Sequence, residues 1–154
     1  MKESRERPPV IDHHALYHLG GHLAVLHRRV QRADETTLLP YDVSSAEARA
    51  LRAMARQNRP LPMSELAKIL DVVPRSVTSL IDELEPMGFV RRTTDPEDLR
   101  RVCVSLTKTG RAIVPKLTAA HGRAVATVLA PLSPHEIEVL DELLRRVAHT
   151  LTDE

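Results

Sequence analysis

One segment of the chain, residues 59–110, restricts the possible folds more than any other. Apolar residues at helical spacing predict a short helix over residues 64–70, followed by a three-residue turn. Pro74 then suits the first position of a second helix, because its backbone angle is already helical and the first amide of a helix needs no partner. Gly88 ends that helix. The pattern therefore predicts two helices joined by a tight turn.

Two short segments after these helices alternate between apolar and polar residues, as strands do. They cover residues 89–93 and 102–106, and a polar loop from Thr94 to Arg101 joins them. Leu61 lies between two prolines and suits the edge of a sheet, where a missing amide donor is tolerated. The sequence thus predicts a mainly α fold with a small β wing, a winged helix-turn-helix.

The outer face of the second helix carries polar side chains that could contact duplex DNA. A helix of this width enters the major groove, where an arginine can donate two hydrogen bonds to guanine and hydroxyls can reach bases or phosphates. The wing adds cations for phosphates or the minor groove. A helix-turn-helix alone is about as often a plain packing unit, and the added wing favours DNA binding. The candidate contacts are Arg75, Ser76, Thr78 and Ser79 on the helix and Arg91, Arg92, Arg100 and Arg101 in the wing.

At this point the sequence resembles a known family, the multiple-antibiotic-resistance regulators, or MarR family. The resemblance is specific over residues 60–112, and the order of helices extends it over nearly the whole chain. The runs that carry it are Ser64-Glu65-Leu66-Ala67, Val77 to Glu85, Gly88-Phe89-Val90-Arg91-Arg92, Asp95 to Arg100, and Val104 to Gly110.

The resemblance implies a homodimeric transcription regulator whose terminal helices form the dimer. It also implies that Arg100 enters the minor groove while Asp98 steadies the wing. Leu99 stands where the family often has a basic or small residue, which implies fewer wing contacts. Ligands of such regulators are often aromatic or phenolic acids, bound between the dimer helices and the DNA-binding lobe.

Long helices flank the central module. Their apolar residues are spaced three and four apart, a seam more regular than a domain of this size needs internally, so we expect these helices to pack against a second copy. We predict one domain over residues 1–154, with dimerisation helices at 12–33 and 108–151 and a winged lobe at 44–107. The seam residues are Leu16, Leu19, Leu23, Leu26 and Val30 in the first helix and Ile137, Leu140, Leu144, Val147 and Leu151 in the last.

Composition narrows the function further. The formal net charge of +1 excludes a polybasic protein that coats nucleic acid, although residues 89–111 have a local basic excess. Aromatic residues make up 2% of the chain, too few for the stacking platforms of single-strand binders. The lone Cys103, with no signal segment and no long apolar run, predicts a cytoplasmic protein without membrane contact. Without a catalytic motif or a phosphate-binding glycine loop, we expect neither an enzyme nor a bound cofactor.

His14, His18 and His22 are four apart and share one helical face. This spacing can bind a divalent metal, but an exposed or interface face is the simpler interpretation, and we expect no metal there. A cleft beside the dimer helices could use these histidines or Arg28 to bind a small anionic or aromatic effector.

The leading hypothesis is a homodimeric repressor that a small molecule releases from an inverted-repeat operator in double-stranded DNA. One alternative is a metal-responsive regulator that uses the N-terminal histidines. The other is a dimeric protein-interaction module that binds no DNA.

Overall fold

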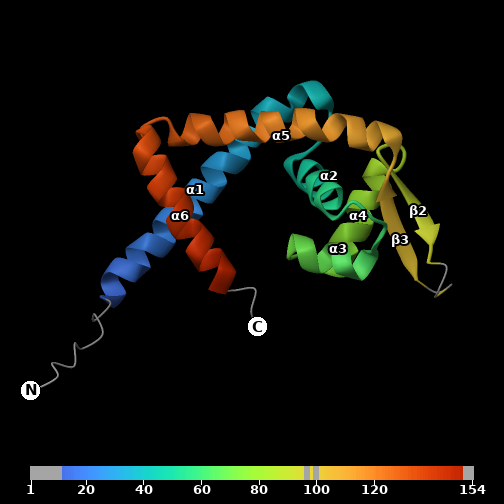
Figure 1. Cartoon of the computed structure of the whole chain (residues 1–154), viewed down its shortest axis with the longest axis horizontal. Helices are drawn as coiled ribbons and strands as arrows, with labels where there is room; N and C mark the ends of the chain where they lie inside the picture. Colours follow the sequence, from blue (N-terminus) through green and yellow to red (C-terminus); the bar gives the residue numbers. More distant parts are fainter. Residues whose placement is uncertain (1–11, 96–97, 99–100, 151–154) are drawn as a thin grey trace, which may run out of the picture.

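The computed structural model describes residues 12–95, 98 and 101–150. Within these residues the chain is mainly helical with a small antiparallel sheet, which confirms the predicted fold class (Figure 1). The elements are α1 (His13–Leu38), the 3-10 helix η1 (Leu39–Tyr41), α2 (Ser45–Gln57), β1 (Leu61–Pro62), α3 (Met63–Leu70), α4 (Pro74–Leu84), β2 (Val90–Thr94), β3 (Val102–Leu106), α5 (Lys108–Leu129) and α6 (Pro134–Thr150).

Helix α5 connects two differently built regions (Figure 1). At its N-terminal end lies a lobe made of α2, α3, α4 and the sheet, with β2 and β3 outermost. Beyond the lobe, α1 packs along α5, and α6 folds back from the C-terminal end of α5. The winged helix-turn-helix thus sits at one end of the described chain and the terminal helices at the other.

The wing is part of a three-stranded antiparallel sheet with strand order β1-β3-β2. In the hairpin, Val90 pairs with Leu106 and Thr94 with Val102. On the other edge of β3, Leu61 pairs with Val104, as its position between two prolines suggested. Because Leu61 is fully buried, this short edge strand also ties the hairpin to the core of the lobe.

Local sequence signals set the helix boundaries in the lobe. The Ser44 hydroxyl accepts a hydrogen bond from the Glu47 main-chain N–H at 3.2 Å, and the Glu47 carboxylate accepts one from the Ser44 N–H at 2.5 Å, so these two residues form a capping box at the start of α2. Pro74 occupies the first turn of α4. Gly88 has a φ of 74°, a left-handed conformation that glycine adopts at no steric cost.

The core of the lobe is closed within the chain. The apolar faces of α2, α3 and α4 meet the inner face of the sheet and one side of α5. The largest fully buried side chains are Leu38, Leu51, Leu61, Leu66, Val77, Ile81, Leu84, Val90, Val104 and Leu117.

The first helix is longer than the sequence suggested. We expected a helix over residues 12–33 and a connection over 34–43, whereas α1 runs to Leu38 and continues directly into η1. The reason is tertiary: Asp34 is 4% exposed and Leu38 fully buried, so the last turns of α1 pack against the rest of the chain. Gly20 and Gly21 do not interrupt α1, and a methyl group on either would meet no atom within 4 Å.

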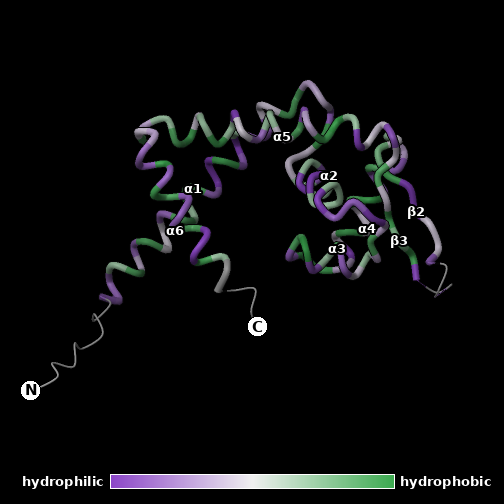
Figure 2. The backbone as a smooth tube through the Cα atoms, in the orientation of Figure 1, coloured by the Kyte–Doolittle hydropathy of each residue, from purple (hydrophilic) through white to green (hydrophobic). Residues whose placement is uncertain are grey.

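Most seam residues of the terminal helices are exposed within the described residues, while Leu26, Val30 and Leu140 are half-buried and Leu151 lies outside the described residues. Apolar residues recur along both α1 and α6 (Figure 2), yet Leu19 is 52% exposed, Leu144 46% and Val147 60%. Among the described elements, α6 has no extensive packing contact with any other. Within the same residues, no helix combines the length and hydropathy that crossing a membrane would require.

Candidate nucleic-acid interface and effector cleft

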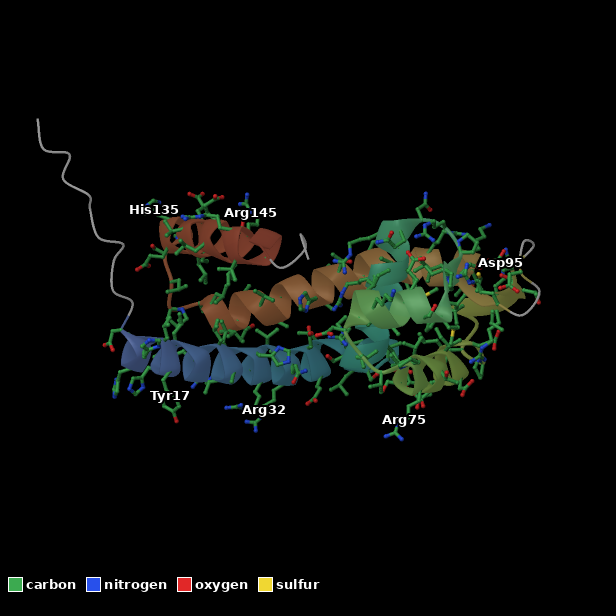
Figure 3. All side chains as sticks on the ribbon, turned by 90° about the horizontal axis from the view of Figure 1, so that it is seen from below. Tyr17, Arg32, Arg75, Asp95, His135 and Arg145 are labelled. Atoms are coloured by element: carbon green, nitrogen blue, oxygen red, sulfur yellow. The ribbon has the colours of Figure 1, made fainter. Side chains whose placement is uncertain are left out.

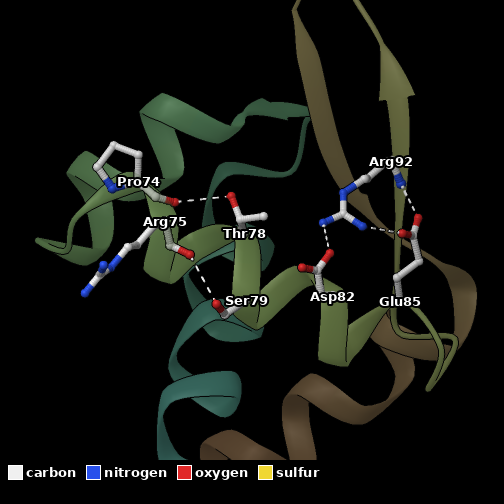
Figure 4. Close-up of polar contacts among 7 residues, drawn as sticks. All are labelled: Pro74, Arg75, Thr78, Ser79, Asp82, Glu85 and Arg92. Carbon is white, nitrogen blue, oxygen red and sulfur yellow. Dashed lines mark hydrogen bonds and ion pairs between the residues drawn. The ribbon is translucent and has the colours of Figure 1, made fainter.

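Helix α4 buries one face and presents the other to solvent. Val77 and Ile81 are fully buried, whereas Arg75, Thr78 and Ser79 are exposed. The guanidinium of Arg75 points away from the molecule (Figures 3 and 4). The Thr78 and Ser79 hydroxyls donate to main-chain carbonyls one turn earlier, at 3.4 and 3.3 Å. These long hydrogen bonds leave both hydroxyls able to turn toward a ligand.

Ser76 and Arg92 are less available than the other predicted contacts. Ser76 is half-buried on the flank of α4. Arg92 lies on β2, and its guanidinium bridges two carboxylates. It donates to Asp82 of α4 at 2.6 Å and to Glu85, which caps the C-terminal end of α4, at 2.7 Å (Figure 4). Its main-chain N–H donates to Glu85 as well, at 2.9 Å. Arg92 therefore links the wing to α4.

This link also changes the acidity of Glu85. The main-chain N–H and the guanidinium of Arg92 both hydrogen-bond the carboxylate and lower the pKa of Glu85, against the opposing effect of desolvation. The carboxylate therefore stays ionised at pH values at which a free glutamate begins to take up a proton.

The wing holds further predicted contacts in a local network. Arg91 is exposed, and its Nε donates to the Ser105 hydroxyl at 3.3 Å. The guanidinium of Arg101 lies 3.8 Å from the carboxylate of Asp95. The main-chain N–H of Arg101 donates to the carbonyl of Asp98 at 2.8 Å. Arg100, for which the resemblance implies a role in the minor groove, lies outside the described residues.

Cys103 lies on β3 of the wing and is buried. Burial first, and then the carboxylate of Asp95, raise the pKa of its thiol.

The residues predicted to bind an effector do not gather in a cleft. His14, His18 and His22 lie exposed on the N-terminal half of α1, where the rings of His14 and His18 are 4.5 Å apart between centroids. Within the described residues, no three histidine, cysteine or acidic side chains are grouped so as to hold a metal ion. Arg28 is exposed on α1 and does not line the cleft described below.

A cleft does lie where the terminal helices meet the lobe, but other residues form it. It has a volume of about 630 Å³ and opens between α1, α2 and α5. Its polar lining comes chiefly from His27 and Asp34 of α1, Arg49, Arg52 and Arg56 of α2, and His121 of α5.

Two hydrogen bonds organise this cleft. The Nδ1 of His121 lies 2.9 Å from both carboxylate oxygens of Asp34 and so joins α5 to α1. Arg52 donates to the carbonyl of Leu117 at 3.3 Å and so joins α2 to α5. Sequence reasoning missed the first pair, because its members are 87 positions apart and Asp34 fell in an expected connection. The sequence signal that could have indicated this cleft is the spacing of Arg49, Arg52 and Arg56, which places them on one face of α2.

Comparison with known proteins shows which proteins this chain resembles in sequence and fold. The MarR family model matches residues 43–102, which run from the start of α2 into the wing. In sequence over this segment, and in fold over most of its length, the chain is similar to the MarR family. The relatives and solved neighbours that carry this similarity are transcriptional regulators with a winged-helix fold, not enzymes, and one was solved with operator DNA.

The similarity to individual MarR proteins extends over most of this chain and most of theirs. The multiple antibiotic resistance protein MarR of Escherichia coli is 29% identical over 130 residues, which cover 84% of this chain and 90% of that protein. The crystal structure of wild-type apo MarR from the same organism has a TM-score of 0.75 at 26% identity, covering 92% and 98% of the two chains. A cysteine-to-serine variant of that MarR in complex with operator DNA has a TM-score of 0.74 at 28% identity, covering 86% and 95%.

Proposed function

We propose that this chain is a MarR-type regulator, a homodimeric repressor that reads an inverted-repeat operator and is released by a small molecule. The observation that carries the proposal is the outer face of α4. It presents Arg75, Thr78 and Ser79 to solvent, while Arg92 fixes the wing beside it. The solved E. coli neighbour in complex with operator DNA supports the same use of the fold.

Base reading and phosphate binding are divided between α4 and the wing. Arg75 opens α4 on its exposed face and can donate a forked pair of hydrogen bonds to guanine. Arg91 and Arg101 of the wing supply charge for the backbone, and Arg100 would join them as the family resemblance implies. Arg92 positions the wing beside α4 and does not itself contact DNA, because its guanidinium is paired with Asp82 and Glu85.

Dimerisation follows from the accessible seams of α1 and α6. Leu19, Leu144 and Val147 are exposed, and burying these apolar side chains against the same surface of a second copy would lower the free energy. A two-fold dimer places two copies of α4 side by side, and two such helices match two half-sites about one helical turn apart. We therefore assign dimerisation to α1, α5 and α6 and operator reading to the lobe over residues 44–107.

The cleft between α1, α2 and α5 is the proposed effector site. It spans the boundary between the dimerisation helices and the lobe, so a ligand there contacts both. Such a ligand changes operator affinity only if it binds the DNA-competent and released arrangements unequally. This cleft replaces the N-terminal histidines and Arg28 as the place where we expect an effector.

The proposal is tested with operator fragments selected from the source genome by the purified full-length protein. We expect selected fragments to share an inverted repeat, binding to weaken steeply with salt, and one dimer to bind each site. A protein-interaction module would select no common sequence, and that result would refute the proposal. Zinc that left operator affinity unchanged would separately exclude the metal-responsive alternative.

A further inference from the structure

The effector cleft is unusually rich in positive charge for its size. Arg49, Arg52 and Arg56 recur at spacings of three and four along α2, so their side chains share one face, and all three line the cleft. His27 and His121 line it from α1 and α5. Asp34 is the single carboxylate among these lining residues, and its two oxygens already face His121 at 2.9 Å.

The arginines repel one another. Burial lowers the pKa of Arg52, Asp34 acts in the opposite direction, and the charges of Arg56 and Arg49 lower it further. The side chains of Arg49 and Arg56 make no ion pair with any described residue. One buried carboxylate therefore balances only part of the charge that three guanidiniums bring to the cleft.

The apolar part of the lining is small and aliphatic. It consists of Val30, Ala46, Ala55 and Val114. Within the described residues, neither phenyl nor phenol side chains line the cleft. The lining therefore offers forked donors for several anionic oxygens, while its ring surface is limited to the imidazoles of His27 and His121.

We propose that the cleft binds a small anion carrying two or more negative charges, with carboxylate or phosphate oxygens seated on the α2 arginines. This rests on the proposed function, in which a ligand of this cleft controls operator binding, and it names the class of that ligand. The charge of the ligand, and not the presence of a ring, defines this class.

The position of Arg52 explains how such an anion would act on DNA binding. Arg52 holds α2 to α5 through the carbonyl of Leu117. An anion that recruits Arg52 competes for this hydrogen bond and draws α2 toward the ligand. Because α2 packs against α3 and α4, a shift of α2 changes the placement of the DNA-reading helix.

The test uses titration calorimetry on the full-length protein at constant ionic strength with three probes. Malonate represents a dicarboxylate, glycerol 3-phosphate a phosphate dianion, and benzoate an aromatic monoacid. We expect one or both dianions to bind and benzoate to bind at least about tenfold more weakly. The stronger of the two dianions identifies the kind of oxygen that the cleft prefers.

Matched variants locate the binding. Arg49→Gln/Arg56→Gln should weaken dianion binding about tenfold or more, and both positions are exposed, so the fold should be retained. Arg32→Gln is the control, because Arg32 is exposed on α1, outside the cleft lining, and points away from the molecule (Figure 3). Should the double variant fail to fold, the two single variants make the same comparison.

Operator affinity measured with and without each probe separates the two proposals. Dianion binding that is lost in the double variant but leaves operator affinity unchanged would support the ligand class and refute effector release. Release of the operator by benzoate alone would refute the ligand class and leave effector release standing. A double variant that loses operator affinity while no dianion binds the wild type would also refute the ligand class, and would assign the arginines to DNA phosphates.

Discussion

The winged lobe and the terminal helices both carry apolar residues at helical spacing, yet they use them differently. In the lobe, Val77, Ile81 and Leu84 of α4 are fully buried by neighbouring elements of the same chain. In α6, Leu144 is 46% exposed and Val147 60%. The same periodicity therefore accompanies a closed core in one region and an exposed apolar face, our proposed dimer surface, in the other. Spacing predicts an apolar face, and the fold shows whether the same chain covers it.

The largest effect is expected from breaking the second region alone. Leu140→Glu/Leu144→Glu places charges in the proposed apolar interface, so the dimer should dissociate and operator binding should fall to the level of one half-site. Light scattering at micromolar concentration and a binding titration measure both changes.

The lobe supplies the control for this experiment. Because its core closes within the chain, the double variant should keep most of its helical circular dichroism. A wild-type protein that scatters as a monomer would contradict the assignment of α1 and α6 to dimerisation. Complete unfolding of the variant would show that the lobe depends on the dimer for its stability.

A second effect concerns the junction between the wing and α5. An added Cβ at Gly110 would lie 1.9 Å from the carbonyl oxygen of Phe89, an overlap that requires the backbone to move. Gly110→Ala should therefore reduce the free energy of unfolding by about 1–3 kcal/mol. Thermal or urea unfolding of the purified protein measures the change.

Gly122, on the same helix, provides a matched control. A Cβ there meets no atom within 4 Å, so Gly122→Ala should be neutral or stabilise the protein by up to about 1 kcal/mol through its higher helix propensity. Equal destabilisation by both substitutions would show that helix flexibility, and not the Phe89 contact, accounts for the Gly110 effect.

The local signals that predicted the lobe correctly act over a few residues. Pro74 begins α4 at a position whose amide needs no partner, and Gly88 adopts the left-handed conformation that follows the end of the helix. Such chemistry can be recognised without knowledge of the fold, and the order of elements followed from it.

The features that the sequence did not reveal depend on distant contacts. The end of α1 was placed too early because Asp34 and Leu38 are held by tertiary packing. Arg92 was counted with the exposed wing cations, although two carboxylates of the α4 region engage it. The cleft that we propose for the effector is lined by residues of three helices, and periodicity within one helix does not show which faces meet.

A third effect compares α4 with the wing. Arg75→Ala should weaken operator binding by about 1–3 kcal/mol and relax base preference at one position of each half-site. Arg91→Ala should weaken binding to all operators alike and make its dependence on salt shallower. Affinities over a salt series and a set of single-base operator changes measure both. Unchanged base preference in Arg75→Ala would mean that another face of the lobe reads DNA.

The smallest effect concerns the link between these two parts of the lobe, through Glu85. Because hydrogen bonds from Arg92 lower its pKa in the folded state, Glu85 contributes stability above the pKa of an unfolded glutamate. That contribution is lost as pH falls through the lowered folded-state pKa. Glu85→Gln should therefore lower the Tm slightly at neutral pH and not at all in strong acid.

The Tm of both proteins is measured between pH 7 and pH 2 to follow this convergence. Glu83→Gln is the control, because Glu83 is exposed on α4 and its side chain makes no ion pair with the described residues. The control should parallel the wild type throughout. If the Glu85→Gln curve runs parallel to the wild type as well, the ionised carboxylate does not stabilise the fold. Arg92 would then be held near α4 without contributing to the stability of the lobe, and its guanidinium would be free to exchange Glu85 for a DNA phosphate.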